Sequence, residues 1–509
     1  MLAHVLTAAV RGVESYLVRV EVNLAPGLPA FAVVGLAESA VREGRERVAA
    51  ALRNAGFPLP PRRITVNLAP ADVRKEGSAF DLPLAVGLLA ASGHVEPRRL
   101  EGVAFLGELG LDGGLRPVRG VLPVASRCAR GGIGSLVVPR ENAAEAAVVE
   151  GLTVLGASSL TEVVAHLDGG PPLAAVAVDV GALLADDVPA GAELRDVKGQ
   201  EGAKRALEVA AAGGHNLLFM GPPGSGKTML ARRLPGILPP LTLPEALEAT
   251  RVHSVAGLLR PGAALVTRRP FRAPHHSVSD AGLVGGGSPV RPGEVSLAHH
   301  GVLFLDELPE YRRHVLEALR QPLEDGRVRL SRARGTEDYP ARFLLVGAMN
   351  PCPCGFWGDG SDRCRCDPSH VARYRSRVSG PLLDRLDLHV EVPAVSFGRL
   401  TEQARGEATA TVRERVVRAR KRQGERFAGC PGVYANAQMD PGLLRRFAQP
   451  PPEVVRLLQD AVDRGLSARA FHRVLKVART LADLADRDRV VADDALEALG
   501  YRALDRRPV

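Results

Sequence analysis

The chain has 509 residues, of which 46% are hydrophobic and 24% charged, a composition typical of a soluble globular protein with several domains. Its net charge of +9 favours a polyanionic partner such as nucleic acid without requiring one. The chain contains no long apolar run or signal-like N-terminus, and six cysteines are too few for a secreted disulfide scaffold. We therefore expect a cytoplasmic protein with no membrane partner.

Residues 1–165 alternate short β-like segments with helical ones, which predicts an α+β domain. The expected strands are 16–23, 30–35, 63–67, 104–109 and 135–139, and the expected helices are 39–55, 82–91 and 141–149. Residues 166–195 are rich in Gly, Pro, Ala and Asp without a clear period, which predicts a linker.

A phosphate-binding loop begins the next domain, which we expect at 196–395. Its residues are Gly221, Pro222, Pro223, Gly224, Ser225, Gly226, Lys227 and Thr228, placed between an apolar strand-like segment and a helical one. Glycines let backbone N–H groups surround a triphosphate, the lysine reaches the β- and γ-phosphates, and the threonine hydroxyl is a ligand for Mg²⁺. This motif predicts that the chain binds ATP with Mg²⁺ on a mainly parallel α/β sheet.

Two later apolar strands end in polar residues suited to nucleotide hydrolysis. Residues 302–305 lead to Asp306, a candidate Mg²⁺ ligand, and Glu307, a candidate for polarising the attacking water. Residues 343–349 lead to Asn350, which either orients the same water or caps a turn.

Four cysteines form two close pairs, Cys352 with Cys354 and Cys364 with Cys366, separated by a loop rich in Gly and Asp. Two such pairs can converge into a tetrahedral thiolate site for Zn²⁺, although the single intervening residue is tighter than the usual spacing. The alternative is four uncoordinated thiols. The adjacent His275 and His276 would point to opposite sides of an extended segment, so we expect no metal site there.

From residue 396 to 509 the pattern is helical and basic, with helices expected at 401–426, 453–464, 468–486 and 492–503. Between residues 413 and 426 the first of these carries seven basic residues: Arg413, Arg415, Arg418, Arg420, Lys421, Arg422 and Arg426. Such a helix is either a solvated surface of a helical lid or a DNA-facing patch.

The loop, the acidic strand end and Asn350 together resemble the AAA+ ATPases. By this resemblance, residues 381–387 correspond to the arginine-finger segment and residues 465–473 to the sensor-2 helix. Arg385 would then complete the site of a neighbouring subunit, and Arg469 would contact the γ-phosphate from the lid. The alternative for each arginine is a surface salt bridge.

Three further segments resemble the magnesium-chelatase-like ATPases, and among these the ComM/YifB family of competence proteins in particular. They are residues 269–276, 293–301 and 350–355. That family implies a hexameric motor that acts in DNA branch migration during natural transformation. It also implies a hairpin at 326–340, in which Arg327, Arg329, Arg332 and Arg334 would line a ring's pore; a solvated edge strand is the alternative.

Residues 1–165 resemble the Lon-protease-like, ribosomal-S5-like domain of the same family. Ser78 lies near the position of a Lon-type nucleophile, but Leu122 stands about where the activating lysine should be. Without a neighbouring base the serine is not activated, so we expect no protease activity.

The expected architecture is thus an AAA+ core with a parallel sheet, preceded by a Lon-like α+β domain and followed by a helical lid. The leading hypothesis is an ATP-driven hexameric ring that remodels single-stranded or branched DNA. A chelatase-type or chaperone-type ATPase that acts on a protein partner is the alternative.

Overall fold

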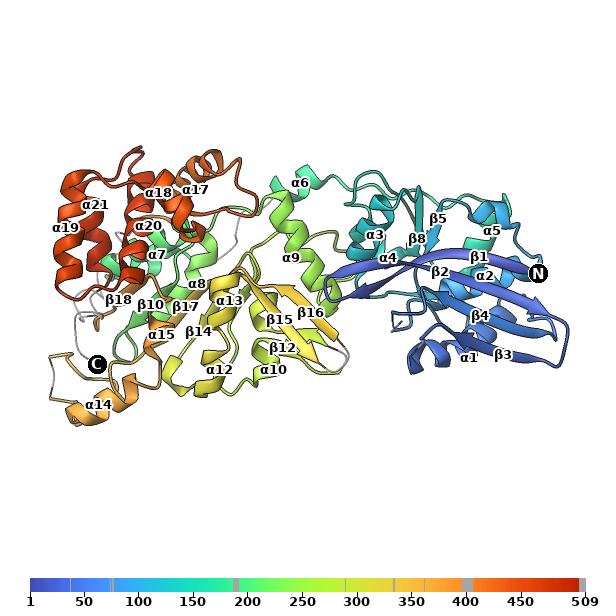
Figure 1. Cartoon of the computed structure of the whole chain (residues 1–509), viewed down its shortest axis with the longest axis horizontal. Coiled ribbons are helices and arrows are strands. Elements are labelled where there is room, and N and C mark those ends of the chain that lie inside the picture. Colours follow the sequence, from blue (N-terminus) through green and yellow to red (C-terminus); the bar gives the residue numbers. More distant parts are fainter. Residues whose placement is uncertain are drawn as a thin grey trace. The chain divides into compact units, whose positions relative to one another are not determined.

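The computed structural model describes residues 1–36, 38–73, 75, 77–185, 192–288, 290–332, 335–360, 362–395 and 406–502. The chain forms two compact units, each assembled from three stretches of sequence (Figure 1). Unit 1 contains Met1–Asp186, Thr242–Thr267 and Arg329–Tyr339, and unit 2 contains Asp187–Leu241, Arg268–Val328 and Pro340–Val509. The segment with the phosphate-binding loop and the helical C-terminal region therefore belong to the same unit.

Unit 1 is built on a seven-stranded mixed sheet in the order β3-β4-β2-β1-β5-β8-β9. The strands are β1 (Leu2–Arg11), β2 (Glu14–Ala25), β3 (Ala30–Val34), β4 (Arg63–Ala69), β5 (Val103–Phe105), β8 (Ser135–Pro139) and β9 (Thr153–Ala157). β2 pairs antiparallel with β1 and β4, and the remaining neighbours are parallel. Strand β1 was not predicted, and the predicted strand 104–109 divides into β5 and β6 (Glu108–Leu109), which pairs with β7 (Leu115–Arg116).

The helices of unit 1 are α1 (Ser39–Asn54), α2 (Asp81–Ser92), α3 (Val121–Arg130), α4 (Arg140–Ala146), α5 (Leu160–Leu167) and α6 (Val180–Ala185). A short 3₁₀ helix, η1 (Pro97–Leu100), follows α2. Helix α2 is apolar around almost its whole circumference, so it is buried from Asp81 to Ala91 and contacts α1, β1 and β2. The largest hydrophobic cluster of this unit lies around α2 and the sheet, and a second one includes α3 and the strands β5, β8 and β9.

Two later segments complete unit 1. Helix α9 (Leu243–Ala256) begins at a capping box of Thr242 and Glu245 and contacts α3. After it, Ala264 and Leu265 share a buried cluster with Leu122 and Val148. The predicted hairpin is present as β15 (Arg327–Arg332) and β16 (Gly335–Pro340), and Arg334 lies outside the described residues.

Unit 2 contains a five-stranded sheet in the order β11-β14-β17-β10-β18, in which every pair of neighbours is parallel, as predicted. Its strands are β11 (Phe271–Arg272), β14 (Val302–Leu305), β17 (Leu344–Met349), β10 (Leu217–Met220) and β18 (Leu388–Glu391). The register aligns Met220 with both Met349 and Glu391, so the carboxyl ends of the central strands share one edge. Such an edge is where parallel α/β sheets bind ligands.

Around this sheet lie the longer helices α7 (Glu201–Gly213), α8 (Lys227–Ile237), α14 (Pro368–Arg375), α17 (Thr409–Arg426), α18 (Pro441–Phe447), α19 (Pro452–Asp463), α20 (Ala468–Leu484) and α21 (Ala492–Gly500). Shorter elements are η2 (Leu194–Asp196), α10 (Asp280–Leu283), β12 (Gly285–Gly286), β13 (Arg291–Pro292), α11 (Glu294–Leu297), η3 (Leu308–Glu310), α12 (Arg313–Glu317), α13 (Arg320–Asp325), α15 (Gly380–Leu383) and η4 (Asn436–Gln438). Helix α17 begins later than the predicted start at 401, and α18 was not predicted.

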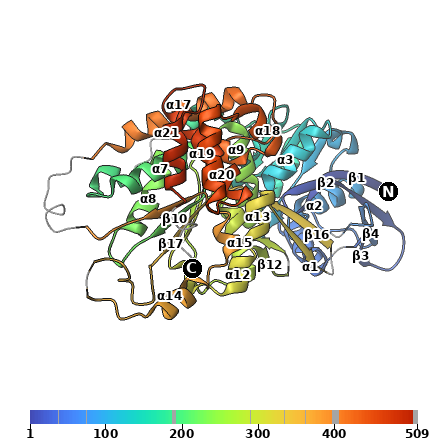
Figure 2. The same cartoon turned by 60° about the vertical axis from the view of Figure 1, so that its left-hand side comes forward.

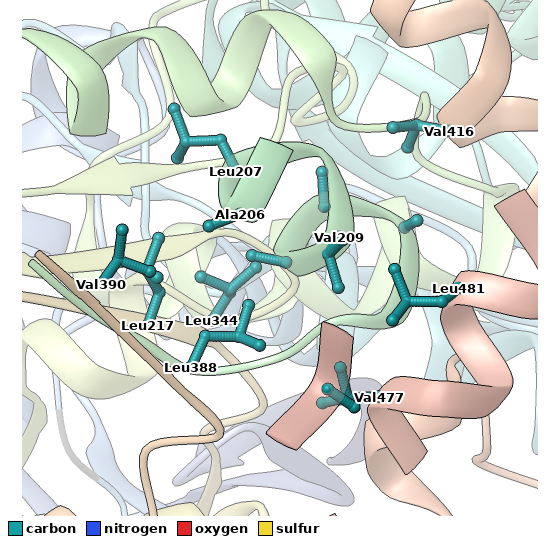
Figure 3. Packing of buried hydrophobic residues seen from close by; sticks show 14 of the residues in the cluster. Ala206, Leu207, Val209, Leu217, Leu344, Leu388, Val390, Val416, Val477 and Leu481 are labelled. Carbon is teal, nitrogen blue, oxygen red and sulfur yellow. The ribbon is translucent and has the colours of Figure 1, made fainter. Parts of the chain in front are cut away.

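Helix α7 joins the sheet to the C-terminal helices. It contacts α8, α17 and α20, which gather beside it in Figure 2. In Figure 3, Ala206 and Val209 of α7 stand between Leu217 and Leu388 of the sheet and Val477 and Leu481 of α20. One continuous hydrophobic core therefore fixes the C-terminal helices to the sheet.

Candidate active site

The phosphate-binding loop connects β10 to α8, and its glycines are required by local geometry. Gly224 and Gly226 have φ of 76° and 95°, the left-handed region that favours glycine. Gly221 has a different reason, since a Cβ there would lie 2.0 Å from the carbonyl oxygen of Val392. Helix α8 starts at Lys227, directly after the loop, so its N-terminal N–H groups face the place where an anion would bind.

Lys227 is only 8% exposed, and its ammonium group is held inside the loop. Its Nζ donates hydrogen bonds to the carbonyl oxygens of Gly221 (2.7 Å) and Pro222 (2.9 Å) and to Oδ1 of Asn350 (3.2 Å). Burial lowers the pKa of Lys227, and the nearby carboxylates of Asp306 and Glu307 oppose this effect. The contact between Lys227 and Asn350 places the end of β17 beside the loop.

Asp306 and Thr228 form the second contact of the site. The Oγ1 of Thr228 donates a hydrogen bond of 2.6 Å to Oδ2 of Asp306, which directly follows β14. A hydroxyl and a carboxylate are hard oxygen ligands of the kind that Mg²⁺ takes beside phosphates. This pair therefore fits Mg²⁺, and the other carboxylate oxygen accepts from the backbone N–H of Glu307 at 2.9 Å.

Glu307 has a left-handed backbone, with φ of 51°, at the start of η3. Non-glycine residues seldom adopt this conformation, and strained residues of this kind occur often at functional sites. The side chain is 58% exposed, and its Oε2 lies 3.5 Å from Nδ1 of His276. The strained turn thus directs an exposed carboxylate away from the core, one residue after Asp306.

The neighbours of Glu307 correct one sequence expectation. His275 and His276 do not point to opposite sides, because their ring centroids are 4.0 Å apart. The reason is that the segment turns, with the N–H of Val278 donating to the carbonyl of His275, instead of continuing extended. Tyr311 supports the turn by donating from its hydroxyl to the carbonyl of Pro274 at 2.6 Å, and its ring meets His276 edge-on.

Besides His276, Gln200 also contributes to the site, by supporting the phosphate-binding loop, and this role was not predicted from the sequence. Its backbone is left-handed at the start of α7, and its Nε2 donates to the carbonyls of Ser225 (3.1 Å) and Pro393 (2.6 Å). It thereby fastens the phosphate-binding loop to the chain that follows β18. The only local signal was a Gly-Gln turn before a helix, which says nothing about a loop 25 residues later.

The two predicted arginines lie in different surroundings. Arg385 is 4% exposed, donates to the carbonyl of Pro381 at 2.6 Å and forms an ion pair with Glu324 of the same chain. Arg469 is exposed in the first turn of α20, which Ser467 caps. One turn further, Arg473 pairs with Asp387, whose carboxylate also contacts the buried His215 at 3.3 Å.

Three of the seven basic residues of α17 bind acidic groups of their own unit. Arg415 pairs with Glu208 and Glu407, Arg422 with Asp486 and Asp488, and Arg426 with Asp483. Arg420 donates to the backbone carbonyls of Ala211 and Tyr434. These contacts favour the lid interpretation of the helix, and they leave Arg418 and Lys421 exposed.

The four paired cysteines come together as predicted. Their sulfur atoms all lie within 4.8 Å of one another, and all four are free thiols. The sulfur of Cys352 is 3.3 Å from that of Cys354 and 3.9 Å from that of Cys364. Mainly because the backbone N–H of Phe356 donates to its sulfur, the pKa of Cys354 falls to about 6.

The arrangement around Ser78 belongs to unit 1. Its hydroxyl contacts the carboxylate of Glu108, while the buried Lys75 donates to the carbonyl of Pro70. Leu122, at the position expected for an activating lysine, is fully buried in the cluster with Val148. In these surroundings Ser78 has a carboxylate neighbour and no contact with an ammonium group among the described residues.

Comparison with known proteins places this site in a family. Models of the magnesium chelatase subunit ChlI family match residues 20–142 and 193–400, and a model of the C-terminal part of ChlI matches 406–502. The chain is 47% identical to the competence protein ComM of Haemophilus influenzae over 99% of this chain and 98% of that protein. It is 45% identical to the uncharacterized protein YifB of Salmonella typhimurium, with the same coverage. The chain belongs to the magnesium-chelatase-like ComM/YifB family.

Within this family assignment, similarity to a chelatase subunit itself is weaker. The magnesium-chelatase 38 kDa subunit of Rhodobacter capsulatus is 29% identical over 174 residues, which cover 30% of this chain and 49% of that protein. The ComM/YifB assignment rests on full-length similarity, and it agrees with the parallel α/β sheet and the helical C-terminal region. Among the described residues no helix has the length and apolar character needed to cross a membrane.

Proposed function

We propose that this protein hydrolyses ATP with Mg²⁺ at the edge of the sheet in unit 2. The observation that carries the proposal is the mutual contact of Lys227 with Asn350 and of Thr228 with Asp306, beside the exposed carboxylate of Glu307. These groups come from the ends of two parallel strands, β14 and β17, and from the start of α8. Together they match what phosphoryl transfer needs: cationic charge, oxygen ligands for a metal and a group that activates water.

Each residue has a defined task in this proposal. The ammonium of Lys227 exchanges its loop carbonyls for the β- and γ-phosphate oxygens and offsets their charge. The hydroxyl of Thr228 and the carboxylate of Asp306 hold Mg²⁺, directly or through water. Glu307 accepts a proton from the attacking water, Asn350 orients that water, and His276 positions the carboxylate of Glu307. Zn²⁺ is proposed as a separate, structural metal at the four cysteines.

Hydrolysis by a ring, most simply a hexamer, is the second part of the proposal. Arg385 is proposed to act on the site of the neighbouring chain, and Arg469 on the γ-phosphate of its own chain, because guanidinium groups stabilise the charge of the transferring phosphoryl group. Arg385 is buried against Glu324, so this task requires Arg385 to exchange Glu324 for the phosphate when chains assemble. An arginine that acts in trans must come from a neighbouring chain. Every site then has such a neighbour only if the chains close into a ring.

DNA is the proposed substrate of the motor, which would move strand junctions during natural transformation. Support comes from the similarity to a competence protein and from the net charge of +9. Unit 2 also has a cavity of about 420 Å³ lined by Arg313, Arg373 and Arg377, of which Arg377 is paired with Glu310. The hairpin contributes less positive charge than its sequence suggests, because Arg329 is paired with Asp338 at 2.9 Å.

One experiment tests the substrate: the ATPase rate of the full chain with single-stranded, duplex and four-way branched DNA of equal nucleotide content. We expect the largest stimulation with branched DNA and a steep loss of stimulation as salt is raised. Absence of stimulation by any DNA, combined with stimulation by a protein partner, would support the chelatase-type or chaperone-type alternative. We expect no peptide cleavage in either case, since Ser78 lacks an ammonium neighbour.

A further inference from the structure

The four cysteines of unit 2 have the geometry of a closed tetrahedral metal site. Zinc bound by four thiolates has Zn–S bonds of about 2.3 Å, which places the sulfur atoms about 3.8 Å apart at the corners of a tetrahedron. The sulfur separations of 3.3, 3.6 and 3.9 Å among Cys352, Cys354 and Cys364 surround this value, and Cys366 lies within 4.8 Å of all three. Thiol ligands in such an arrangement favour Zn²⁺ among the common divalent ions.

The segment that carries the first cysteine pair is also a wall of the nucleotide site. Asn350, which contacts Lys227, is two residues before Cys352. The N–H of Gly355 closes a turn by donating to the carbonyl of Cys352 at 3.0 Å. Gly355 packs directly on the phosphate-binding loop, because a Cβ there would lie 2.5 Å from Cδ of Pro223. One short stretch therefore contacts the loop at two points, Pro223 and Lys227.

The second cysteine pair lies in the segment just before α14. Helix α14 in turn contacts the segment that carries the first pair. Arg375 near the end of α14 donates from Nε to the carbonyl of Pro351 at 3.0 Å. Between the pairs, the guanidinium of Arg363 lies 4.2 Å from the ring centre of Phe356. Arg363 also pairs with Asp359, but most of the described side chains between 356 and 366 are exposed, so this part of the chain has little hydrophobic core of its own. A metal bond would supply the rigidity that packing does not.

We propose that Cys352, Cys354, Cys364 and Cys366 bind one Zn²⁺ ion, and that the metal holds the turn at Gly355 against Pro223, so that the phosphate-binding loop keeps the shape that accepts ATP. The zinc site is inferred from the geometry of the cysteines alone. The effect of zinc on the phosphate-binding loop depends, in addition, on the proposed binding of ATP. Zinc here has a structural task, since four protein ligands leave no open position for a substrate.

Metal content tests the site. The full chain purified without added chelator is expected to hold one zinc per chain by elemental analysis, and to release it when the thiols are titrated with an organomercurial. Replacement by Co²⁺ should give the intense visible absorption of tetrahedral thiolate coordination. Cys354→Ser and Cys364→Ser should lose the metal, whereas Cys430→Ser, which changes a cysteine outside the cluster, should keep it. A wild-type chain without zinc, or with a disulfide in this segment, overturns the proposal.

Nucleotide affinity tests the effect on the loop. Removing zinc, with Mg²⁺ then restored, should weaken binding of a fluorescent ATP analogue at least about tenfold while far-ultraviolet circular dichroism stays unchanged. Gly355→Ala should weaken binding although the four thiols remain, because its methyl group collides with Pro223. The matched control is Gly358→Ala, which also has a left-handed backbone, with φ of 77°, but meets nothing within 4 Å.

Two results would overturn this second step: unchanged affinity after zinc removal, or equal losses of affinity for the two glycine variants. The outcome is distinguishable from failure of the proposed function. If the zinc-loaded wild-type chain binds no nucleotide, ATP binding itself is wrong, while the metal content still reports on the cysteine site.

Discussion

The edge of the sheet in unit 2 and the surroundings of Ser78 in unit 1 both carry residue types typical of catalysis, but their contacts differ. In unit 2, Lys227, Asn350, Thr228 and Asp306 contact one another as donor and acceptor pairs. In unit 1, the buried Lys75, three residues before Ser78, donates to a backbone carbonyl instead. Convergence of complementary groups from separate elements, more than the presence of a serine or a lysine, distinguishes a competent site.

Lys227→Ala should have the largest effect, because it removes the only ammonium group held inside the loop among the described residues. We expect nucleotide affinity to fall at least about a hundredfold, together with loss of turnover. Equilibrium binding of a fluorescent ATP analogue is the measurement. Arg232→Ala, an exposed change on the same helix, should bind normally. Retained affinity in Lys227→Ala would contradict the assignment of the loop.

Glu307→Gln should separate binding from chemistry. The amide keeps the shape of the side chain but does not accept a proton, so we expect turnover to fall about 10²- to 10³-fold with nucleotide affinity preserved. Steady-state phosphate release measures the loss. Glu310→Gln, in the same 3₁₀ turn and paired with the exposed Arg377, is the control and should hydrolyse normally. Comparable rates in the two variants would remove Glu307 from the mechanism.

Asn350→Ala should reduce turnover about 10- to 100-fold, because it removes a polar group at the place where the γ-phosphate and water would meet. Affinity should change much less, since the ammonium of Lys227 remains to bind the phosphates. Separate measurement of kcat and of KM in the variant and the wild type decides this. A change confined to KM would indicate that Asn350 only supports the loop.

His276→Ala should have a smaller effect, about fivefold on turnover, since it acts by positioning the Glu307 carboxylate at 3.5 Å. His275→Ala is the control, because the Nδ1 of His275 contacts Ser277 and its ring reaches Glu307 only through His276, whose ring lies 4.0 Å away. In the background of Glu307→Gln the change at His276 should have no further effect on turnover. Additive losses in the double variant would show that His276 does not act through Glu307.

Ser78→Ala should have the smallest effect on ATP turnover. This variant tests the surroundings of Ser78 in unit 1. ATP turnover should stay within about twofold of the wild type, and neither protein should cleave a casein-type substrate. Peptide cleavage that depends on Ser78 would mean that Glu108, which contacts its hydroxyl, is sufficient to activate it.

The parts of the site that depend on local chemistry could be predicted from the sequence. Glycines at 224 and 226 are needed for left-handed backbone, and an apolar strand ending in Asp306 and Glu307 places carboxylates at a sheet edge whatever the surroundings. The convergence of the cysteine pairs was likewise readable from their spacing. The parallel sheet followed from alternating strands and helices.

Other parts depend on contacts between distant segments, which composition and periodicity do not specify. The turn that brings His276 to Glu307 and the link from Gln200 to the loop are of this kind. The role of α17 is another, because its arginines look free in sequence while their acidic partners, such as Glu208 and Asp483, come from α7 and α20. The assignment of residues 242–267 to unit 1 depends equally on packing that no local pattern encodes.

That interrupted assembly of unit 1 decides how the protein can be dissected. A gene fragment that stops after residue 186 would encode the seven-stranded sheet but omit Ala264 and Leu265, so the apolar surfaces of Leu122 and Val148 would face water. Such a fragment should aggregate unless residues 242–267 are grafted back through a linker. Because each unit is made of three separate stretches of sequence, cutting the chain at one position separates neither unit intact.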